Sequence, residues 1–474
     1  MSMPIKIPAP KEVRSVHLIA ICGTAMGALA CMLKEMGYGV TGSDQHVYPP
    51  MSDFLRGKGI HIFEGFNADH LAARPDLVVV GNAVSKENPE AKAVQALALP
   101  YCSMPQAINH FAAAGKRQIV VTGTHGKTTT SSFIAWMLFC AQLDPSFLIG
   151  GILVDFSSNY RVGGGSWIVL EGDEYDTAFF DKGAKFFHYT PDVAVLTSVE
   201  FDHADIFNDL DHVKQTFRKF LERLAPQADL VAFDADENIA ELLPVVQCQI
   251  VGYGNRPNTE WTLGAVRIAP PYTHFKVYRH GQPYGDFKTR MIGTHNLSNL
   301  LAGVAVAHRL KIGDAALAHA LESFKGVRRR QEVRGIKNDI VVIDDFAHHP
   351  TAVRETIHAV KSFYGQRRLV AVFEPRTNSS RRNVFQSVYP ACFAGADEIC
   401  IRQAPLLEKI PAEQRFSSSR LVDDLRAQGK SAHFFQDTDA IITFLRDRAR
   451  PGDVLLIMSN GGFDNIHARL LEEL

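Results

Sequence analysis

Short apolar runs alternate with longer amphipathic segments in the first part of the chain. This pattern predicts strands over residues 16–21, 39–41 and 77–80, and a helix over residues 25–36. Uniformly apolar strands separated by helices are typical of a parallel sheet that is covered on both faces. We therefore predict a Rossmann-like α/β domain over residues 1–114.

The alternation of strands and helices resumes near residue 115. The pattern predicts strands over residues 118–122, 167–170 and 193–197, a helix over residues 128–141, a β-rich insertion over residues 261–291, and a helix over residues 296–310. The basic run 328–330, closely followed by Arg334, marks a charged hinge. We predict a central α/β domain over residues 115–330, with a mostly parallel sheet.

A third α/β unit follows the hinge. Its apolar runs predict strands over residues 340–343, 369–373, 398–401 and 454–458. We predict a C-terminal Rossmann-like domain over residues 331–474.

The composition agrees with several folded domains and limits the possible partners. At about 150 residues per domain, a chain of 474 residues predicts about three domains. Lys and Arg number 50 and Asp and Glu number 51, so a net charge of -1 provides no global field for nucleic acid or an anionic membrane. The apolar run over residues 133–141 is too short to span a membrane. Seven cysteines without a paired spacing favour a reducing cytoplasm over a disulfide framework.

The strongest chemical signal is a glycine-containing loop between an apolar strand and a helix. Its residues are Gly123, Thr124, His125, Gly126, Lys127 and Thr128. Backbone N–H groups at the helix start would face phosphate oxygens, Lys127 would supply a positive charge, and the Thr128 hydroxyl could hold Mg²⁺. Val121 stands where the usual phosphate-loop pattern begins with glycine, which leaves a glycine-rich turn with an unrelated lysine as the alternative.

Acidic clusters follow two apolar strands of the same predicted domain. They are Glu171, Asp173, Glu174 and Asp176 after residues 167–170, and Glu200, Asp202, His203 and Asp205 after residues 193–197. Ligands of open α/β sheets bind beyond the carboxyl ends of strands, where these groups could hold Mg²⁺ against phosphate. A solvated acidic surface is the alternative for either cluster alone, but two clusters beside a phosphate loop favour a site.

Polar residues also follow the predicted strands of the third domain. They are Asp344, Asp345, His348 and His349 after the first strand, Arg376 and Asn378 after the second, and residues 459–462 after the last. The guanidinium of Arg376 suits a substrate carboxylate. The paired histidines have a structural alternative, because they could cap the helix that we expect to start at Thr351.

A second glycine loop, Gly23 to Gly27, follows the first predicted strand, and Asp44 lies 21 residues beyond Gly23. The loop suits a diphosphate and the carboxylate suits a ribose hydroxyl. The full dinucleotide-binding pattern is absent, so this signal is weak by itself.

Together, these motifs resemble those of the ATP-dependent Mur ligases of peptidoglycan synthesis and recycling. The resemblance is carried by Gly123 to Thr130, by the two acidic clusters, by His295, Asn296, Leu297 and Asn299, and by Asp344 to Pro350. It extends over essentially the whole chain and implies three domains in the same order. In this family the phosphate loop is itself shortened, which accounts for Val121.

The resemblance implies a role for each matched residue. It implies ATP binding by Gly123, Thr124, Gly126, Lys127, Thr128, Thr129, Asn296, Arg330 and Asp345, with Lys127, Glu171 and His203 catalytic and Thr128, Glu171 and His203 as Mg²⁺ ligands. It implies substrate binding by Gly23, Thr24, Met26, Gly27, Asp44, His46, Asn82, His348, Arg376 and Asn378. A carbamylated lysine occurs in some relatives, and Lys214 and Lys219 are the possible positions here.

The motifs resemble the branch of the family that acts on UDP-N-acetylmuramate, in which one enzyme adds free L-alanine and another adds the murein tripeptide L-alanyl-γ-D-glutamyl-meso-diaminopimelate. Tyr175, the segment 373–378 and the segment 458–463 are more similar to the tripeptide-adding enzyme. We therefore expect a cytoplasmic ligase of peptidoglycan recycling that forms an acyl phosphate from ATP. A phosphate-loop ATPase and a nucleotide-sugar dehydrogenase are the alternatives from other classes, and the oligomeric state stays open.

Overall fold

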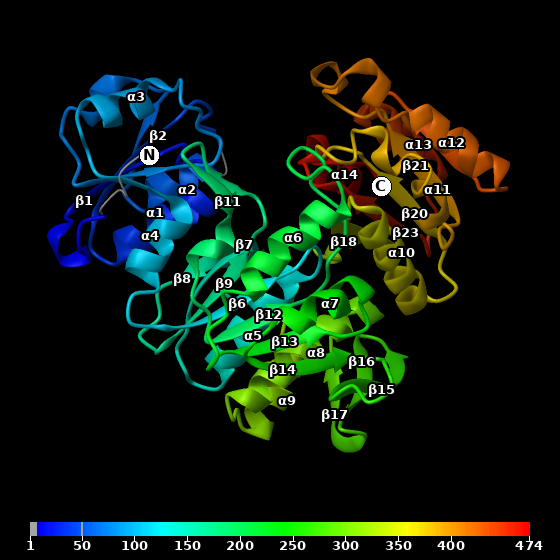
Figure 1. Cartoon of the computed structure of the whole chain (residues 1–474). Helices are drawn as coiled ribbons and strands as arrows, with labels where there is room; N and C mark the ends of the chain where they lie inside the picture. The colour runs from blue at the N-terminus through cyan, green and yellow to red at the C-terminus, as the bar shows by residue number, and fades with distance from the viewer. Residues whose placement is uncertain (1–6, 49–50) are drawn as a thin grey trace. The chain divides into compact units, whose positions relative to one another are not determined.

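The computed structural model describes residues 7–48 and 51–474, so the first six residues of the predicted N-terminal domain lie outside the described part. The chain divides into two compact units. The first unit comprises residues 1–199, 214–261 and 302–320, and the second comprises residues 200–213, 262–301 and 321–474. Each unit is described by itself below, with the elements labelled as in Figure 1.

The first unit begins with a five-stranded parallel sheet in the order β3-β2-β1-β4-β5. The strands are β1 (Ser15–Ile19), β2 (Gly39–Asp44), β3 (His61–Glu64), β4 (Leu77–Val80) and β5 (Tyr101–Ser103). The helices are α1 (Thr24–Glu35), α2 (Met51–Gly57), α3 (Pro89–Ala96) and α4 (Met104–Ala107). All four residues of β4 are buried, as expected for a strand between two helical layers. The Rossmann-like prediction for this region is confirmed.

The predicted strand over residues 16–21 ends earlier, at Ile19. Ala20 turns the chain with a φ of 65°, and the backbone N–H groups of Ala20 and Ile21 both donate to Ser43 O. This turn directs the chain into the glycine loop at the start of α1, at the carboxyl end of the sheet.

The first unit also contains seven neighbouring strands of the second sheet, in the order β14-β13-β12-β6-β9-β7-β8. They are β6 (Arg117–Thr122), β7 (Ser146–Leu153), β8 (Ser158–Arg161), β9 (Trp167–Gly172), β12 (Val193–Leu196), β13 (Asp229–Phe233) and β14 (Gln249–Gly254). Only β8 runs antiparallel to its neighbour, so the prediction of a mostly parallel sheet is confirmed. The register pairs Thr122 of β6 with Gly172 of β9 and with Leu196 of β12, so these three strands end at the same level.

Further elements belong to the middle part of the chain. They are α5 (Lys127–Cys140), the hairpin β10 (Asp176–Ala178) and β11 (Asp181–Ala184), α6 (Leu210–Leu221), α7 (Glu237–Leu242), β15 (Trp261–Ala269), β16 (Tyr272–Arg279), β17 (Gln282–Thr289), α8 (Thr294–Arg309) and α9 (Asp314–Ser323). Strands β16 and β17 form an antiparallel hairpin. The predicted β-rich insertion is therefore confirmed, and the predicted helix over residues 296–310 starts two residues earlier.

The second unit contains a six-stranded sheet in the order β18-β19-β23-β20-β21-β22, yellow to red in Figure 1. The strands are β18 (Glu332–Lys337), β19 (Ile340–Asp345), β20 (Leu369–Phe373), β21 (Glu398–Arg402), β22 (Ala432–Phe435) and β23 (Val454–Met458). The helices are α10 (Pro350–Tyr364), α11 (Tyr389–Cys392), α12 (Ser418–Ala427), α13 (Thr438–Arg448) and α14 (Ile466–Glu473). Only β18 is antiparallel.

Two hydrophobic cores cover the two faces of this last sheet. Along β19, Val341 and Ile343 join the core formed with α10, α11 and α12, whereas Ile340 and Val342 join the core formed with α13 and α14. Successive side chains of a strand point to opposite faces of the sheet, and both faces are covered here. The run is therefore apolar at every position.

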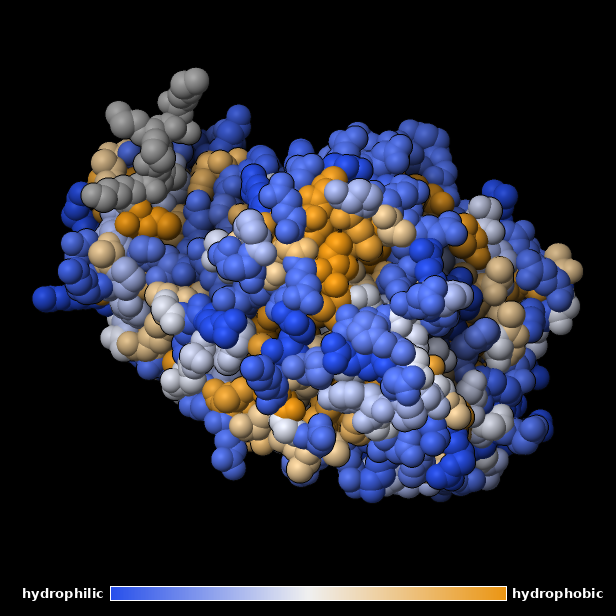
Figure 2. Space-filling model, turned by 60° about the horizontal axis from the view of Figure 1, so that its bottom comes forward, coloured by the Kyte–Doolittle hydropathy of each residue, from blue (hydrophilic) through white to orange (hydrophobic). Residues whose placement is uncertain are grey.

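The surface contrasts with these cores. Figure 2 shows a face that is mostly hydrophilic, with hydrophobic patches between the polar side chains. Among the helices of residues 7–48 and 51–474, none has the length and apolar character needed to cross a membrane.

Candidate active site

The phosphate loop lies between the end of β6 and the start of α5. Gly126 caps α5 with a φ of 81°, and Gly123 has a φ of 132°. A Cβ atom on Gly123 would overlap Thr197 Oγ1 and approach Ser198 N within 2.8 Å, so both its conformation and its surroundings require glycine. The loop is held from β12, because Thr197 Oγ1 donates to His125 O at 2.5 Å and His125 N donates to Ser198 Oγ at 2.8 Å.

Lys127 begins α5 and its ammonium lies within the loop. Lys127 Nζ donates to Gly123 O at 2.6 Å and to Glu174 Oε2 at 2.7 Å, and the two side chains of this ion pair are only 11% and 2% exposed. Burial alone would lower the pKa of Lys127, but the charges of Glu174, Asp173 and Glu171 outweigh it and raise the pKa. The ammonium is therefore charged and placed where the loop can receive an anion.

Thr128 and Glu171 form an oxygen pair beside the loop. Glu171 lies near the carboxyl end of β9, and its Oε1 accepts a hydrogen bond from Thr128 Oγ1 at 3.0 Å. Its other oxygen accepts from Gly150 N at 2.8 Å. A hydroxyl and a carboxylate are the hard oxygen donors that Mg²⁺ prefers, so these residues fit a magnesium ion at the phosphates. The structure thus brings together Lys127, Thr128 and Glu171, as the sequence predicted.

A second group of predicted ATP-binding residues lies together in the other unit. Asn296 Nδ2 donates to Gln331 Oε1 at 2.9 Å, and Gln331 N donates to Asp345 Oδ2 at 2.8 Å. The Arg330 guanidinium lies 4.8 Å from the centroid of the Phe346 ring. Burial raises the pKa of Asp345 despite the opposing charge of Arg330. Gln331, which the sequence analysis did not single out, connects Asn296 to Asp345.

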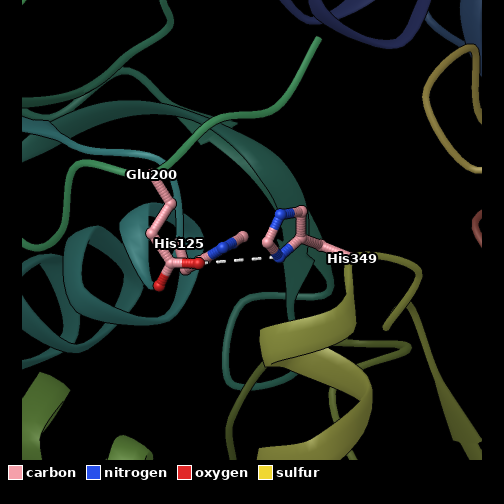
Figure 3. Close-up of side chains that lie close together, drawn as sticks. All are labelled: His125, Glu200 and His349. Carbon is pink, nitrogen blue, oxygen red and sulfur yellow. Dashed lines mark ion pairs between the residues drawn. The ribbon is translucent and has the colours of Figure 1, made fainter. Parts of the chain in front are cut away.

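The acidic loop, residues 200–205, is in the same unit as α10. Glu200 Oε2 accepts a hydrogen bond from Thr351 Oγ1 at 2.6 Å and lies 3.8 Å from His349 Nδ1 (Figure 3). Asp202 Oδ2 lies 3.7 Å from His348 Nε2. Burial alone would raise the pKa of Asp202, but the hydrogen bond from His348 and the charges of nearby histidines hold the pKa well below 3.8.

The two histidines that follow β19 have different surroundings. His349 caps α10 by accepting a hydrogen bond from Thr351 N at 3.3 Å, so the structural alternative holds for this residue. The helix starts at Pro350, one residue before the expected position. His348 makes no such cap, because its Nδ1 faces Phe346 O at 3.0 Å and its Nε2 faces Asp202.

Arg376 and Asn378 follow β20 and both contact carboxylates of the protein. Arg376 lies 3.5 Å from the buried carboxylate of Glu374. A Cβ atom on Gly461 would overlap the Arg376 side chain, so this glycine makes room for the guanidinium. Asn378 Nδ2 donates to Asp205 Oδ2 at 2.9 Å.

The loop Gly23 to Gly27 starts α1 at the carboxyl end of the N-terminal sheet. Asp44 ends the adjacent strand β2, and its carboxylate accepts hydrogen bonds from Cys22 N at 2.9 Å and His46 N at 3.1 Å. Asn82 follows β4, the other neighbour of β1, and is exposed. The remaining predicted residues of this region, Thr24 and Met26, lie in the first turn of α1, exposed and buried respectively. All of them share one edge of the sheet.

Three family models match consecutive parts of the chain. Residues 15–116 match the Mur ligase family catalytic domain, residues 121–307 the Mur ligase middle domain, and residues 329–461 the Mur ligase glutamate ligase domain. The chain belongs to the Mur ligase family. Mur ligases are ATP-dependent enzymes that form amide bonds, which agrees with a phosphate loop as the strongest motif of this chain.

Individual Mur ligases match this chain along its whole length. The UDP-N-acetylmuramate--L-alanyl-gamma-D-glutamyl-meso-2,6-diaminoheptandioate ligase of Escherichia coli is 36% identical over 97% of this chain and 98% of its own. The UDP-N-acetylmuramate--L-alanine ligase of Acetivibrio thermocellus is 31% identical over 99% and 98%. The crystal structure of a murein peptide ligase from Psychrobacter arcticus is 33% identical, with a TM-score of 0.71 over 97% of this chain and 98% of that chain.

Some residues of this Mur ligase site were not assigned a role from sequence. Glu174 was found within an acidic cluster, but its pairing with Lys127 joins residues 47 positions apart, which the sequence analysis could not predict. Gln331 has no neighbouring pattern that could have indicated it. Lys214, one of the two lysines considered for carbamylation, donates to Glu241 Oε2 at 2.7 Å, where a carbamate would face a carboxylate.

Proposed function

We propose that this protein is the ATP-dependent ligase that joins UDP-N-acetylmuramate to the murein tripeptide L-alanyl-γ-D-glutamyl-meso-diaminopimelate. The observation that carries the proposal is the 36% identity to the Escherichia coli ligase of that name, over nearly the whole of both chains. Ligases named for L-alanine are less similar, at 31% identity for the Acetivibrio thermocellus enzyme. Ligation of L-alanine is therefore the second candidate.

The reaction requires activation, because a carboxylate is a poor electrophile. An oxygen of the lactyl carboxylate attacks the γ-phosphorus of ATP and ADP leaves, which gives an acyl phosphate. The α-amine of the peptide then attacks the carbonyl carbon, phosphate leaves, and a proton is released to solvent. Catalysis of this kind depends mainly on positioning and on neutralising phosphate charge.

The charged Lys127 is our candidate for neutralising the β- and γ-phosphates, since its ammonium lies among the backbone groups of the loop. Thr128 and Glu171 would hold Mg²⁺, which adds positive charge at the phosphates when bound. We assign His203 to a second Mg²⁺ on the resemblance alone. Gly123, Thr124, Gly126 and Thr129 would complete the phosphate site.

We assign the ligands to the three predicted domains. We assign residues 1–114 to the UDP-sugar, with the Gly23 to Gly27 loop at the diphosphate and Asp44 nearby. Residues 115–330 would bind ATP and residues 331–474 the peptide, with Asn296, Arg330 and Asp345 at the nucleoside. Arg376 is the candidate for a peptide carboxylate, because its neighbour Glu374 is held by Arg402 and Ser459 as well.

The seven cysteines are free thiols, and both substrates of the first step are nucleotides. These facts favour the cytoplasm as the location of the enzyme.

The deciding experiment measures ADP release by the full chain with ATP, Mg²⁺ and UDP-N-acetylmuramate. We expect release only when the tripeptide is also present, with a product heavier by the tripeptide minus one water in mass spectrometry. Release with L-alanine in preference to the tripeptide would establish the second candidate instead. Release without any amine acceptor would contradict both.

A further inference from the structure

The acidic loop is held on the C-terminal sheet by a set of side chains that we call the clamp, namely His348, His349, Thr351, Asn378 and Ser379. Three contacts are made by the segment after β19: Glu200 accepts a hydrogen bond from Thr351 Oγ1 at 2.6 Å, Phe201 O lies 3.1 Å from His349 Nε2, and Asp202 Oδ2 lies 3.7 Å from His348 Nε2. Two contacts are made by the segment after β20: Ala204 N donates to Ser379 Oγ at 3.1 Å, and Asp205 Oδ2 accepts from Asn378 Nδ2 at 2.9 Å. Five successive contacts over six residues fix the path of the loop. They come from two segments, one after β19 and one after β20.

His203 lies in the middle of this loop, between Asp202 and Ala204, which are both held. Its backbone has a φ of 55°, a left-handed conformation that residues other than glycine adopt only when the surroundings stabilise it. His203 O also accepts hydrogen bonds from Ile206 N at 2.9 Å and from Phe207 N at 3.0 Å. The contacts on both sides therefore determine where the His203 side chain starts.

Asn378 is oriented at both ends of its amide. Arg381 Nη2 donates to Asn378 Oδ1 at 2.8 Å, while Asn378 Nδ2 donates to Asp205. A guanidinium can only donate and a carboxylate can only accept, so the amide has one orientation. Asn378 thus connects a cation of the C-terminal sheet region to the acidic loop.

We propose that the clamp positions His203 for the ligase reaction, and that Asn378 is a positioning residue of the acidic loop rather than a ligand of the peptide. The proposal rests on the proposed function for the role of His203. It predicts that residues after β20 affect the phosphate chemistry, since the segment after β20 holds the loop that carries His203.

The test swaps the amide of residue 378 and the carboxylate of residue 205, first singly and then together, in the full chain. Asn378→Asp places two carboxylates together while keeping an acceptor for Arg381, so the loop should detach without loss of the fold. Hydrogen–deuterium exchange at Ala204, whose amide donates to Ser379, should accelerate roughly tenfold, the scale of one charge-assisted hydrogen bond. Adding Asp205→Asn restores an amide–carboxylate pair and should return the exchange rate to within about twofold of the wild type.

Asp209→Asn is the matched control for Asp205→Asn, because it makes the same carboxylate-to-amide change just beyond the loop, where Asp209 accepts from His212 N at 2.8 Å. Asparagine accepts this kind of backbone hydrogen bond at the start of a helix about as well as aspartate does. The hydrogen–deuterium exchange rate of the Ala204 amide should therefore not change. For ligation, Asn378→Asp should lower kcat and leave the KM for the tripeptide within about twofold, and the double variant should recover kcat.

Unchanged exchange in Asn378→Asp, or no recovery in the double variant, would overturn the clamp. A rise in tripeptide KM at constant kcat would overturn the positioning role and show that Asn378 binds the peptide. Failure of the proposed function is seen separately, as absence of tripeptide-dependent ADP release by the wild-type protein.

Discussion

Replacement of Lys127 by alanine should abolish ADP formation and also destabilise the first unit. The structure pairs Lys127 Nζ with Glu174 Oε2 at 2.7 Å, and 2% of the Glu174 side chain is exposed. Lys127→Ala leaves this carboxylate buried without its ammonium partner. Breaking a buried ion pair from one side costs about 3 kcal/mol or somewhat more.

This cost can be measured as a change in the thermal unfolding midpoint by calorimetry. For a cooperative unit of this size, about 3 kcal/mol lowers the midpoint by roughly 6 to 12 °C. Adding Glu174→Gln to Lys127→Ala removes the buried charge while keeping the shape, and should recover at least about half of the lost stability. Activity should stay absent in the double variant, because the cation at the phosphates is still missing.

Lys182→Ala is the control for this experiment. Lys182 forms an ion pair with Asp176 at 3.1 Å in the adjacent hairpin, but 67% of the Lys182 side chain is exposed. An exposed pair contributes at most about 1 kcal/mol, so the midpoint should shift by no more than about 4 °C. A wild-type midpoint in Lys127→Ala, or no recovery on adding Glu174→Gln, would refute the argument from burial. Substantial ADP formation by Lys127→Ala would refute the catalytic assignment.

Three further predictions concern other parts of the site. Gly123→Ala should abolish ATP binding in calorimetric titrations, because its φ of 132° and the overlap with Thr197 displace the loop; retained binding would contradict this. Glu171→Gln should raise the Mg²⁺ concentration needed for half-maximal ADP release by roughly tenfold, since an amide replaces a charged ligand; an unchanged requirement would exclude Glu171 as a ligand. The lowered pKa of Asp202 stabilises the fold above its unfolded value of 3.8, and this contribution is lost as the pH falls below that value. The stability difference between wild type and Asp202→Asn should therefore shrink as the pH falls below about 4, and a constant difference would mean that His348 does not hold the charge of Asp202.

The fold was largely predictable because its strands are buried on both faces. Runs such as Val78 to Val80 and Val454 to Met458 are apolar at every position, which distinguishes them from the amphipathic helices between them. Shorter or more polar strands gave no such signal. The strand Ala432–Phe435 lies at the edge of its sheet and has one buried residue among four, and the strands β10 and β11 have only three and four residues.

The chemistry was predictable where the backbone imposes a residue type. Gly123 and Gly126 need positive φ, and Lys127 and Thr128 follow them in sequence, so the whole phosphate loop is local. Partners that come from distant elements could be recognised as polar but could not be paired. The contacts of Glu174 with Lys127 and of Asp205 with Asn378 join residues 47 and 173 positions apart, and they depend on tertiary structure.

The net charge of the chain is near zero, and ion pairs within the site show how this balance is reached locally. Two of the cationic groups that we assign to substrates already contact a carboxylate of the protein: Lys127 contacts Glu174, and Arg376 contacts Glu374. Each of these proposed binding steps would exchange an internal carboxylate for a phosphate or carboxylate of the substrate, instead of neutralising an isolated charge. Such an exchange changes the local charge less than neutralisation does, so we expect weak long-range attraction of the anionic substrates and an affinity that depends on geometry within the site.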